Sequence, residues 1–327
     1  MNKKKIKVAF IYKQSNKFLT GKHFDNTYYH FFMNALRRNV RIEITYFPAE
    51  DSFDTSILKD KFDIVLLFGN NTLGTPDDLI GIQDLNIPVI SRAGEPHTAR
   101  RYRMIDYHKK YKIDYYFNYL HESHFYEYYP RNFKYKCIIF GLEPSLYQNL
   151  TPYDNRIKNR ILNSGETGKT DIIYRIRNWI VSRESRAYRH YKLRTLCNKL
   201  PYVDYTSRHS HGYVNDRYPL LLSKYATAIA ATTTYPTIKY WEIPAAGCLT
   251  FMEITKQNKA EYLGFVDGET SIFINEQNYN EKFNEYLSDM ENPKWKKIAE
   301  AGRNYALNEL NNDKATESLA DLMNELI

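Results

Sequence analysis

The sequence DIVLLF, at residues 63–68, is an almost wholly apolar run of β-strand length, and it decides the fold class. A strand of this kind is covered on both faces, as the strands of parallel sheets are. Two more short apolar runs flank it along the chain, KVAFIY at Lys7–Tyr12 and PVIS at Pro88–Ser91, with amphipathic segments between them. Strands that alternate with helices predict βαβ units and a mostly parallel sheet with helices on both faces.

The rest of the chain continues this alternation. In the first half we expect further strands at Arg41–Phe47, Asp114–Asn118 and Lys136–Phe140, and helical segments at Pro76–Ile82, Thr98–Tyr111 and Glu122–Tyr128. In the second half the expected strands are Arg160–Ser164, Ala226–Ala231, Cys248–Met252 and Thr270–Ile274, followed by helices at Glu281–Met290, Pro293–Leu310 and Lys314–Ile327. The same alternation of strands and helices therefore occurs in both halves of the chain.

A segment without periodicity, Gly141–Asn155, separates the two halves and contains two prolines. We place the domain boundary there, which gives an N-terminal domain over residues 1–150, a C-terminal domain over 151–312 and a last helix over 313–327. The predicted fold class is α/β, with two tandem Rossmann-like domains facing a cleft. Ligands of such sheets bind outside the carboxyl ends of the strands, so the cleft is the expected site.

The composition of the chain limits its expected partners and its expected location. The 327 residues carry 46 Lys+Arg against 38 Asp+Glu, a formal charge of +8, which favours an anionic partner. The longest apolar runs are far shorter than the roughly 20 residues of a membrane-spanning helix, so no transmembrane segment is expected. The three cysteines, Cys137, Cys197 and Cys248, have neither disulfide-framework nor metal-site spacing. We therefore expect a cytoplasmic location.

The segment KYWEIPAAGCLT, Lys239–Thr250, resembles the nucleotide-sugar signature of group-1 glycosyltransferases of the GT-B fold. Within that group it is most similar to the CgeB-like (spore-maturation type) branch. The resemblance covers roughly residues 158–312. Its supporting matches are Tyr174 and Arg177 in the upstream helix, GFVDGETSIFI at Gly264–Ile274, and the helix at Asn292–Leu307.

The resemblance implies a donor site in the C-terminal domain. Glu242 is expected to accept hydrogen bonds from the ribose hydroxyls, and the Gly165 loop to meet the diphosphate. The cations Lys169, Arg177 and Lys239 are expected to offset the charge on the leaving diphosphate. The resemblance also implies metal-independent transfer without a cofactor, and a last helix that returns to the N-terminal domain.

Two other positions belong to the expected donor site. Gly247 ends the small-residue run that lets the helix approach the nucleotide. Thr234 stands where many retaining members carry a glutamate, eight residues before Glu242, so the retaining or inverting outcome stays open. The hydroxyls of the TTT run at 232–234 are either sugar contacts or simply a β-branched strand end.

The expected catalytic residues lie in RAGEPHTARR, Arg92–Arg101, which follows a strand and opens a helix. Glu95 and His97 are therefore expected at the carboxyl edge of the first sheet, where an imidazole beside a carboxylate suits acid–base work on an acceptor hydroxyl. The alternative is that both residues only cap the next helix.

Two rival functions remain open. GETGKT, Gly165–Thr170, resembles a P-loop, but Asn163 stands where that loop needs its first glycine, which disfavours an ATPase or GTPase. Lysines, arginines and tyrosines that alternate over residues 100–112 and 171–209 are typical of nucleic-acid contacts or of a solvated helix face. His209 and His211 have no third ligand at sensible spacing, so no metal site is expected.

The sequence thus predicts a glycosyltransferase that moves a hexose or pentose from a nucleoside-diphosphate donor, such as a UDP-sugar, to a hydroxyl acceptor. Acceptors that fit are a glycan, a glycolipid or a modified nucleobase, and the charge allows a polyanion such as DNA or a cell-surface glycan. The alternative is a nucleic-acid-binding protein or a P-loop-like nucleotide hydrolase that uses residues 165–170. The oligomeric state stays open.

Overall fold

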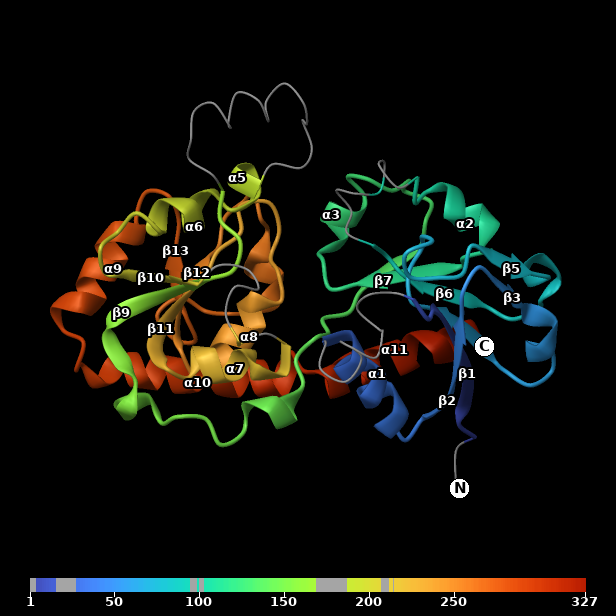
Figure 1. The fold of residues 1–327 in the computed structure, drawn as a ribbon, viewed down its shortest axis with the longest axis horizontal. Helices are drawn as coiled ribbons and strands as arrows, with labels where there is room; N and C mark the ends of the chain where they lie inside the picture. Colours follow the sequence, from blue (N-terminus) through green and yellow to red (C-terminus); the bar gives the residue numbers. More distant parts are fainter. Residues whose placement is uncertain are drawn as a thin grey trace. The chain divides into compact units, whose positions relative to one another are not determined.

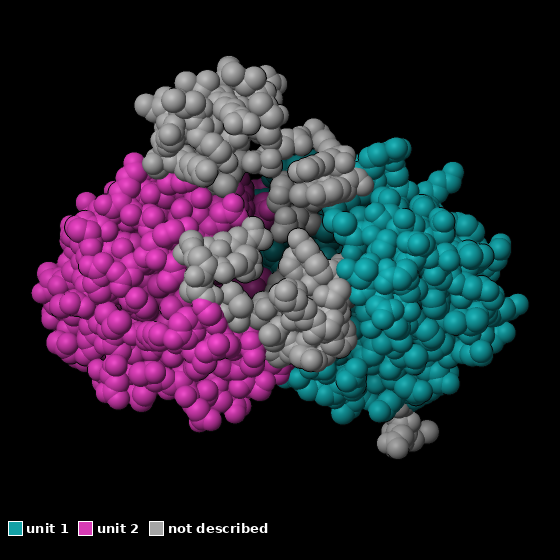
Figure 2. Space-filling view, in the orientation of Figure 1, with its two compact units in different colours: residues 1–141, 312–327 teal, residues 142–311 magenta. Residues whose placement is uncertain are grey.

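The chain divides into two compact units, which Figure 2 colours separately. In this computed structural model, residues 4–15, 28–94, 99, 103–168, 187–206, 212–213 and 215–327 are described. Unit 1 comprises residues 1–141 and 312–327, and unit 2 comprises residues 142–311. The break falls at the start of the aperiodic segment, earlier than the boundary expected after residue 150, and the last helix is part of unit 1.

The main sheet of unit 1 is parallel throughout, as the apolar runs predicted (Figure 1). Across the described residues its strands stand in the order β2 (Ile42–Ala49), β1 (Ile6–Lys13), β4 (Ile64–Leu67), β6 (Val89–Arg92), β7 (Tyr115–Asn118) and β8 (Tyr135–Cys137). Its helices are α1 (Tyr28–Arg38), α2 (Asp106–Lys110), α3 (Glu122–Phe125) and α11 (Asn312–Leu326).

Both faces of this sheet are buried, as two consecutive residues of β7 show. Tyr116 and Phe117 are 0% and 1% exposed, and successive side chains of a strand point to opposite faces. The Tyr116 ring packs on Phe125 of α3 at 5.6 Å, and the Phe117 ring packs on Phe32 of α1 at 6.2 Å. Helices therefore cover the sheet on each side, which explains the continuous apolar strands.

The helix expected at Pro76–Ile82 is wrong. This segment instead forms the short strand β5 (Asp78–Ile80), which pairs in parallel with β3 (Ser52–Asp54). Leu79 is buried between exposed neighbours, which is the alternation of a strand, and Gly81 has a φ of +77° that ends the strand in a tight turn. A 3₁₀ turn, η3 (Ile82–Asp84), follows.

Unit 2 contains a second parallel sheet (Figure 1). Among the described residues its order is β10 (Val203–Thr206), β9 (Ile157–Ser164), β11 (Tyr225–Ala230), β12 (Leu249–Glu253) and β13 (Ile272–Ile274). The helices of this unit are α5 (Ala187–His190), α6 (Lys192–Cys197), α7 (Tyr218–Leu222), α8 (Lys239–Ala245), α9 (Tyr279–Ser288) and α10 (Pro293–Glu309).

The strand order of unit 2 has a switch point between β9 and β11. From β9 the chain goes to β10 on one side and then returns to β11 on the other. In open α/β sheets the crevice outside the carboxyl ends of the strands at such a point is where ligands bind. The residues that follow β9 and β11 are therefore the first place to look for a site.

Helix α11 packs on unit 1 through apolar and polar contacts. Leu319 is fully buried, and the buried Asn312 accepts a hydrogen bond from the Gly141 N–H at 2.7 Å. On the surface, Arg41 forms an ion pair with Asp321 at 2.6 Å. Burial of the apolar face dominates this packing, because exposed ion pairs contribute little.

We therefore expect Leu319→Ala to lower the free energy of unfolding by about 2–5 kcal/mol, since it leaves a cavity in the core. The control, Asp321→Ala, removes only the surface ion pair and should cost less than about 1 kcal/mol. Urea unfolding followed by circular dichroism measures both. Equal losses for the two variants would contradict this account of the packing.

Candidate functional site

A glycine marks the switch point of unit 2. Gly165 follows β9 directly and has a φ of +100°, a conformation that residues with a side chain rarely adopt. Its N–H donates to the carbonyl of Thr206 at 2.9 Å, and the Gly168 N–H donates to the Thr195 hydroxyl at 2.8 Å. These two loop amides are thus already engaged within the protein, so the charge of the site comes from side chains.

Two cations converge on Gly165. A Cβ atom placed on this glycine would lie 2.9 Å from Nη2 of Arg194 and 3.0 Å from Cε of Lys239. Arg194, on α6, is 1% exposed, and Lys239 is the first residue of α8. A larger residue at position 165 would therefore collide with both cationic side chains.

Neutral groups hold Arg194 in place. Its Nε donates to Oδ1 of Asn163 at 3.1 Å, and its Nη2 donates to the Ser164 carbonyl. The guanidinium also lies 5.1 Å from the centre of the Tyr191 ring. Burial lowers the pKa of Arg194, but an arginine keeps its proton at any physiological pH.

Lys239 is held in the same manner. Its Nζ donates to the Tyr218 hydroxyl at 2.7 Å and to Oγ of Ser164 at 3.3 Å, and lies 4.2 Å from the centre of the Tyr218 ring. No ion pair among the described residues includes Lys239 or Arg194. Two neighbouring cations that form no ion pair form a site that attracts an anion.

Glu242 lies one helical turn after Lys239, on the same face of α8. It is half-buried, and no side chain or amide within the described ranges donates a hydrogen bond to its carboxylate. Burial raises the pKa of Glu242 and lowers that of Lys239, and the charge of each partly opposes the shift of the other. The carboxylate is therefore available to accept hydrogen bonds from a ligand.

The structure thus brings together three of the predicted donor-site residues, Gly165, Lys239 and Glu242. The Thr234 hydroxyl is hydrogen-bonded to Nδ1 of His190. Gly247 lies beyond the other end of α8, where its φ of +76° terminates the helix.

Four predicted residues lie outside the described ranges: Glu95 and His97, expected to be catalytic, and Lys169 and Arg177, expected to bind the donor. The same holds for His209 and His211 and for residues 171–186 and 207–209 of the basic stretch.

Arg194 and Tyr218 are the site residues that sequence reasoning missed. Arg194 is one of many basic residues between positions 171 and 209, a stretch equally typical of a solvated helix face. The one sequence feature that could have indicated its burial is its position next to the apolar Leu193. In the structure Leu193 and Thr195 are both buried.

A second buried carboxyl lies at the end of β12. Glu253 is 2% exposed, and its Oε2 has no hydrogen-bond partner in the part of the chain that the structure describes. Burial raises the pKa of Glu253 to about 8, and the nearby charge of Glu276 adds to the rise. The group therefore stays largely protonated at neutral pH.

This shift predicts a pH-dependent stability. At pH values between the ordinary glutamate pKa and about 8, Glu253 keeps its proton in the folded protein and loses it in the unfolded chain. The free energy of unfolding therefore falls as the pH rises through this range. Relative to the wild type, Glu253→Gln should gain on the order of 1 kcal/mol per pH unit across that window. Urea unfolding at several pH values measures the gain. The exposed control Glu261→Gln should show none, and a pH-independent difference for Glu253→Gln would contradict the burial argument.

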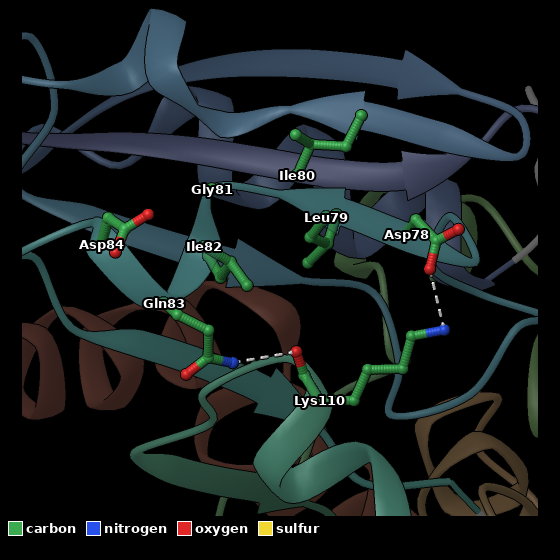
Figure 3. Close-up of a pocket in the computed structure, with 8 residues that line it drawn as sticks. All are labelled: Asp78, Leu79, Ile80, Gly81, Ile82, Gln83, Asp84 and Lys110. Carbon is green, nitrogen blue, oxygen red and sulfur yellow. Dashed lines mark hydrogen bonds and ion pairs between the residues drawn. The ribbon is translucent and has the colours of Figure 1, made fainter.

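Unit 1 contains an open hollow of about 390 Å³ beside β5 and η3, drawn in Figure 3. Lys110, which lines it, is paired with Asp78 at 3.0 Å. Gln83 donates to the Lys110 carbonyl at 3.2 Å (Figure 3). Asp84 also lines it, so the hollow does not share the excess positive charge of the Gly165 cluster.

Two absences hold for the described ranges. No three or more His, Cys, Asp or Glu side chains gather there in a way that would hold a metal ion. Every helix there falls short of the length or the apolarity that a bilayer-spanning segment needs.

The sequence matches no known family model and no curated protein. Solved structures are similar in fold. Sucrose-phosphate synthase (tll1590) from Thermosynechococcus elongatus has a TM-score of 0.59 at 11% identity, over 98% of this chain and 99% of that one. Anabaena Alr3699/HepE in complex with UDP and glucose has a TM-score of 0.57 at 11% identity, over 98% and 100%. An alpha-glucosyltransferase in complex with UDP-glucose and DNA containing an abasic site has a TM-score of 0.60 at 8% identity, over 98% and 100%.

At these identities the similarity establishes the fold. It spans nearly the whole of each chain, and it confirms the predicted class of two Rossmann-like domains with the GT-B architecture. The CgeB-like branch is not distinguished by these matches.

Proposed function

We propose that this chain is a GT-B glycosyltransferase that moves a sugar from a nucleoside-diphosphate donor to a hydroxyl acceptor. The observation that carries the proposal is the pair of cations, Arg194 and Lys239, that meets at Gly165 without an ion pair among the described residues. The Glu242 carboxyl nearby offsets at most one of the two charges. Solved proteins of the same fold that hold UDP or UDP-glucose support the proposal. The resemblance of the KYWEIPAAGCLT segment to group-1 enzymes, and within them to the CgeB-like branch, supports membership of that group.

The diphosphate of the donor binds at the two cations. A nucleoside diphosphate leaving group gains negative charge as the bond to the sugar breaks, and preorganised cations stabilise that charge. Arg194 is fixed by two hydrogen bonds to neighbouring backbone and side chain, so little reorganisation accompanies the reaction. Lys169 and Arg177, which follow the same loop in sequence, add to this charge.

The ribose binds at Glu242. A carboxylate accepts hydrogen bonds from two vicinal hydroxyls at once, and this one has no competing donor among the described residues. Burial makes such a carboxylate costly in the free protein, so a ligand that hydrogen-bonds to it relieves part of that cost. The donor site therefore combines cations for the diphosphate with an acceptor for the sugar of the nucleoside.

Unit 1 binds the acceptor and supplies the base. The segment that holds Glu95 and His97 continues directly from the carboxyl end of β6, which is the ligand-binding edge of a parallel sheet. The charge of +8 favours a polyanionic acceptor, a cell-surface glycan or DNA. The fold neighbour in complex with DNA supports a nucleobase among the acceptors.

A P-loop hydrolase fits the structure less well. A P-loop cradles phosphates with the amides of its glycine-rich loop, and here the amides of Gly165 and Gly168 are bonded within the protein. Side-chain cations, by contrast, remain for the anion. The GT-B architecture also favours the transferase over a module that only binds nucleic acid.

We expect Glu242→Ala to abolish most of the stabilisation that nucleoside diphosphates give the wild type. A ligand at a hundred times its Kd stabilises by about 2.7 kcal/mol, and the variant loses the ribose contacts. A thermal-shift screen over nucleoside diphosphates and their sugars measures this.

The exposed control Glu300→Ala should respond like the wild type. No stabilisation of the wild type by any nucleotide would contradict the donor site. Stabilisation by ATP alone, with turnover, would instead favour the hydrolase.

Transfer should also be independent of metal, because Arg194 and Lys239 supply the positive charge that a divalent cation provides in metal-dependent transferases. The rate of sugar transfer should stay the same after treatment with EDTA. A loss of rate that Mg²⁺ or Mn²⁺ restores would show that the cations do not suffice.

A further inference from the structure

The ammonium of Lys239 is held in an unfavourable place. The charge of Arg194 lies beside it, and both burial and that charge lower the pKa of Lys239. Lysine has a long flexible stem, and Glu242 lies one helical turn away at the spacing of an i, i+3 ion pair. Nζ nevertheless contacts Tyr218 and Ser164, so these two residues outweigh the acidic alternative.

Tyr218 is itself fixed from two directions. It is the first residue of α7, followed by Pro219, which restricts the backbone there, and it is 8% exposed. Its hydroxyl lies 2.5 Å from Oγ of Ser164. The ring therefore cannot move without breaking the contact to Ser164 and disturbing the start of the helix.

The ammonium fixes the direction of one hydrogen bond in this cluster. An ammonium only donates, so the Tyr218 hydroxyl accepts from Lys239. Either hydroxyl can be the donor in the hydrogen bond between Tyr218 and Ser164. Tyr218 thereby joins Lys239 and Ser164 in one hydrogen-bonded cluster.

We propose that Tyr218 is a positioning residue of the donor site, which holds the Lys239 ammonium beside Gly165 where the diphosphate binds. This inference rests on the proposed function. Tyr218 itself does not touch the ligand. Without its hydroxyl, the Lys239 ammonium keeps only the longer contact to Ser164, so the charged form is less favoured beside Gly165.

Tyr218 has no role as a base. Burial and the nearby charge of Glu242 raise the pKa of its hydroxyl, which therefore keeps its proton. Its part in the site is to accept a hydrogen bond from the Lys239 ammonium.

The first test compares binding of UDP and uridine to the wild type and Tyr218→Phe by titration calorimetry. Loss of a hydrogen bond to a charged group should weaken UDP by about tenfold and leave uridine within about twofold. UDP binding should be lost at high pH, when Lys239 loses its proton. The pH of this loss should fall by about one unit in Tyr218→Phe, because the ammonium loses a hydrogen-bond acceptor. In a Lys239→Met background, Tyr218→Phe should have almost no further effect.

The matched control is Tyr286→Phe, a buried tyrosine of the same unit whose hydroxyl donates to the Lys158 carbonyl. It should change neither UDP affinity nor the pH limit. If both tyrosine variants weaken UDP alike, or if Tyr218→Phe leaves the pH limit unmoved, the role of Tyr218 is only structural and the proposal is wrong.

A second measurement needs no nucleotide. The pKa of Lys239, followed by lysine-selective NMR in the free protein, should fall in Tyr218→Phe and stay unchanged in Tyr286→Phe. An unchanged value in Tyr218→Phe would overturn the positioning role. If the wild type binds no nucleoside diphosphate at all, the proposed function fails, and this pKa alone decides whether Tyr218 positions Lys239.

Discussion

A buried guanidinium and a half-buried ammonium approach the same glycine in unit 2, and the rest of the site depends on how they are kept there. Removing a charge from water costs several kcal/mol unless partners replace the water. Here the partners are neutral: the Ser164 carbonyl and Asn163 for Arg194, and the Tyr218 and Ser164 hydroxyls for Lys239. No carboxylate among the described residues forms an ion pair with either cation, and the nearby Glu242 offsets at most one of the two charges, so positive charge remains for an anion.

The strand order explains why the cations meet at this place. β9 lies inside the sheet, with β10 on one side and β11 on the other, and its carboxyl end opens at the switch point. α6 brings Arg194 to that end, and α8 starts there with Lys239 and Glu242. Gly165 is required between them, since a side chain would collide with both cations and its φ is positive.

Much of the fold was predictable from the sequence because most strands are covered on both faces. β4 is buried along its whole length and is a continuous apolar run, and β12, also buried throughout, has apolar residues at three of its five positions. Strands at the edge of a sheet or outside the two main sheets could not be predicted in this way. β10 is an edge strand with a mixed burial pattern, and β5, in its own two-stranded sheet, has only Leu79 buried, so neither stands out from a loop or a helix.

The site residues that lie in a short sequence signature were predictable. Lys239 and Glu242 stand one helical turn apart in the KYWEIPAAGCLT segment, and the structure brings them to Gly165. The roles of Arg194 and Tyr218 could not be predicted in this way. Only its burial distinguishes Arg194 from the solvated arginines, and Tyr218 is one of 30 tyrosines in the sequence.

A crystal structure of the protein with a bound nucleoside diphosphate, such as UDP, tests the central claim most directly. The account predicts diphosphate oxygens within hydrogen-bond distance of the Arg194 guanidinium and the Lys239 ammonium, with the ribose hydroxyls on Glu242. A nucleotide bound elsewhere, with Arg194 and Lys239 free of phosphate contacts, would contradict it.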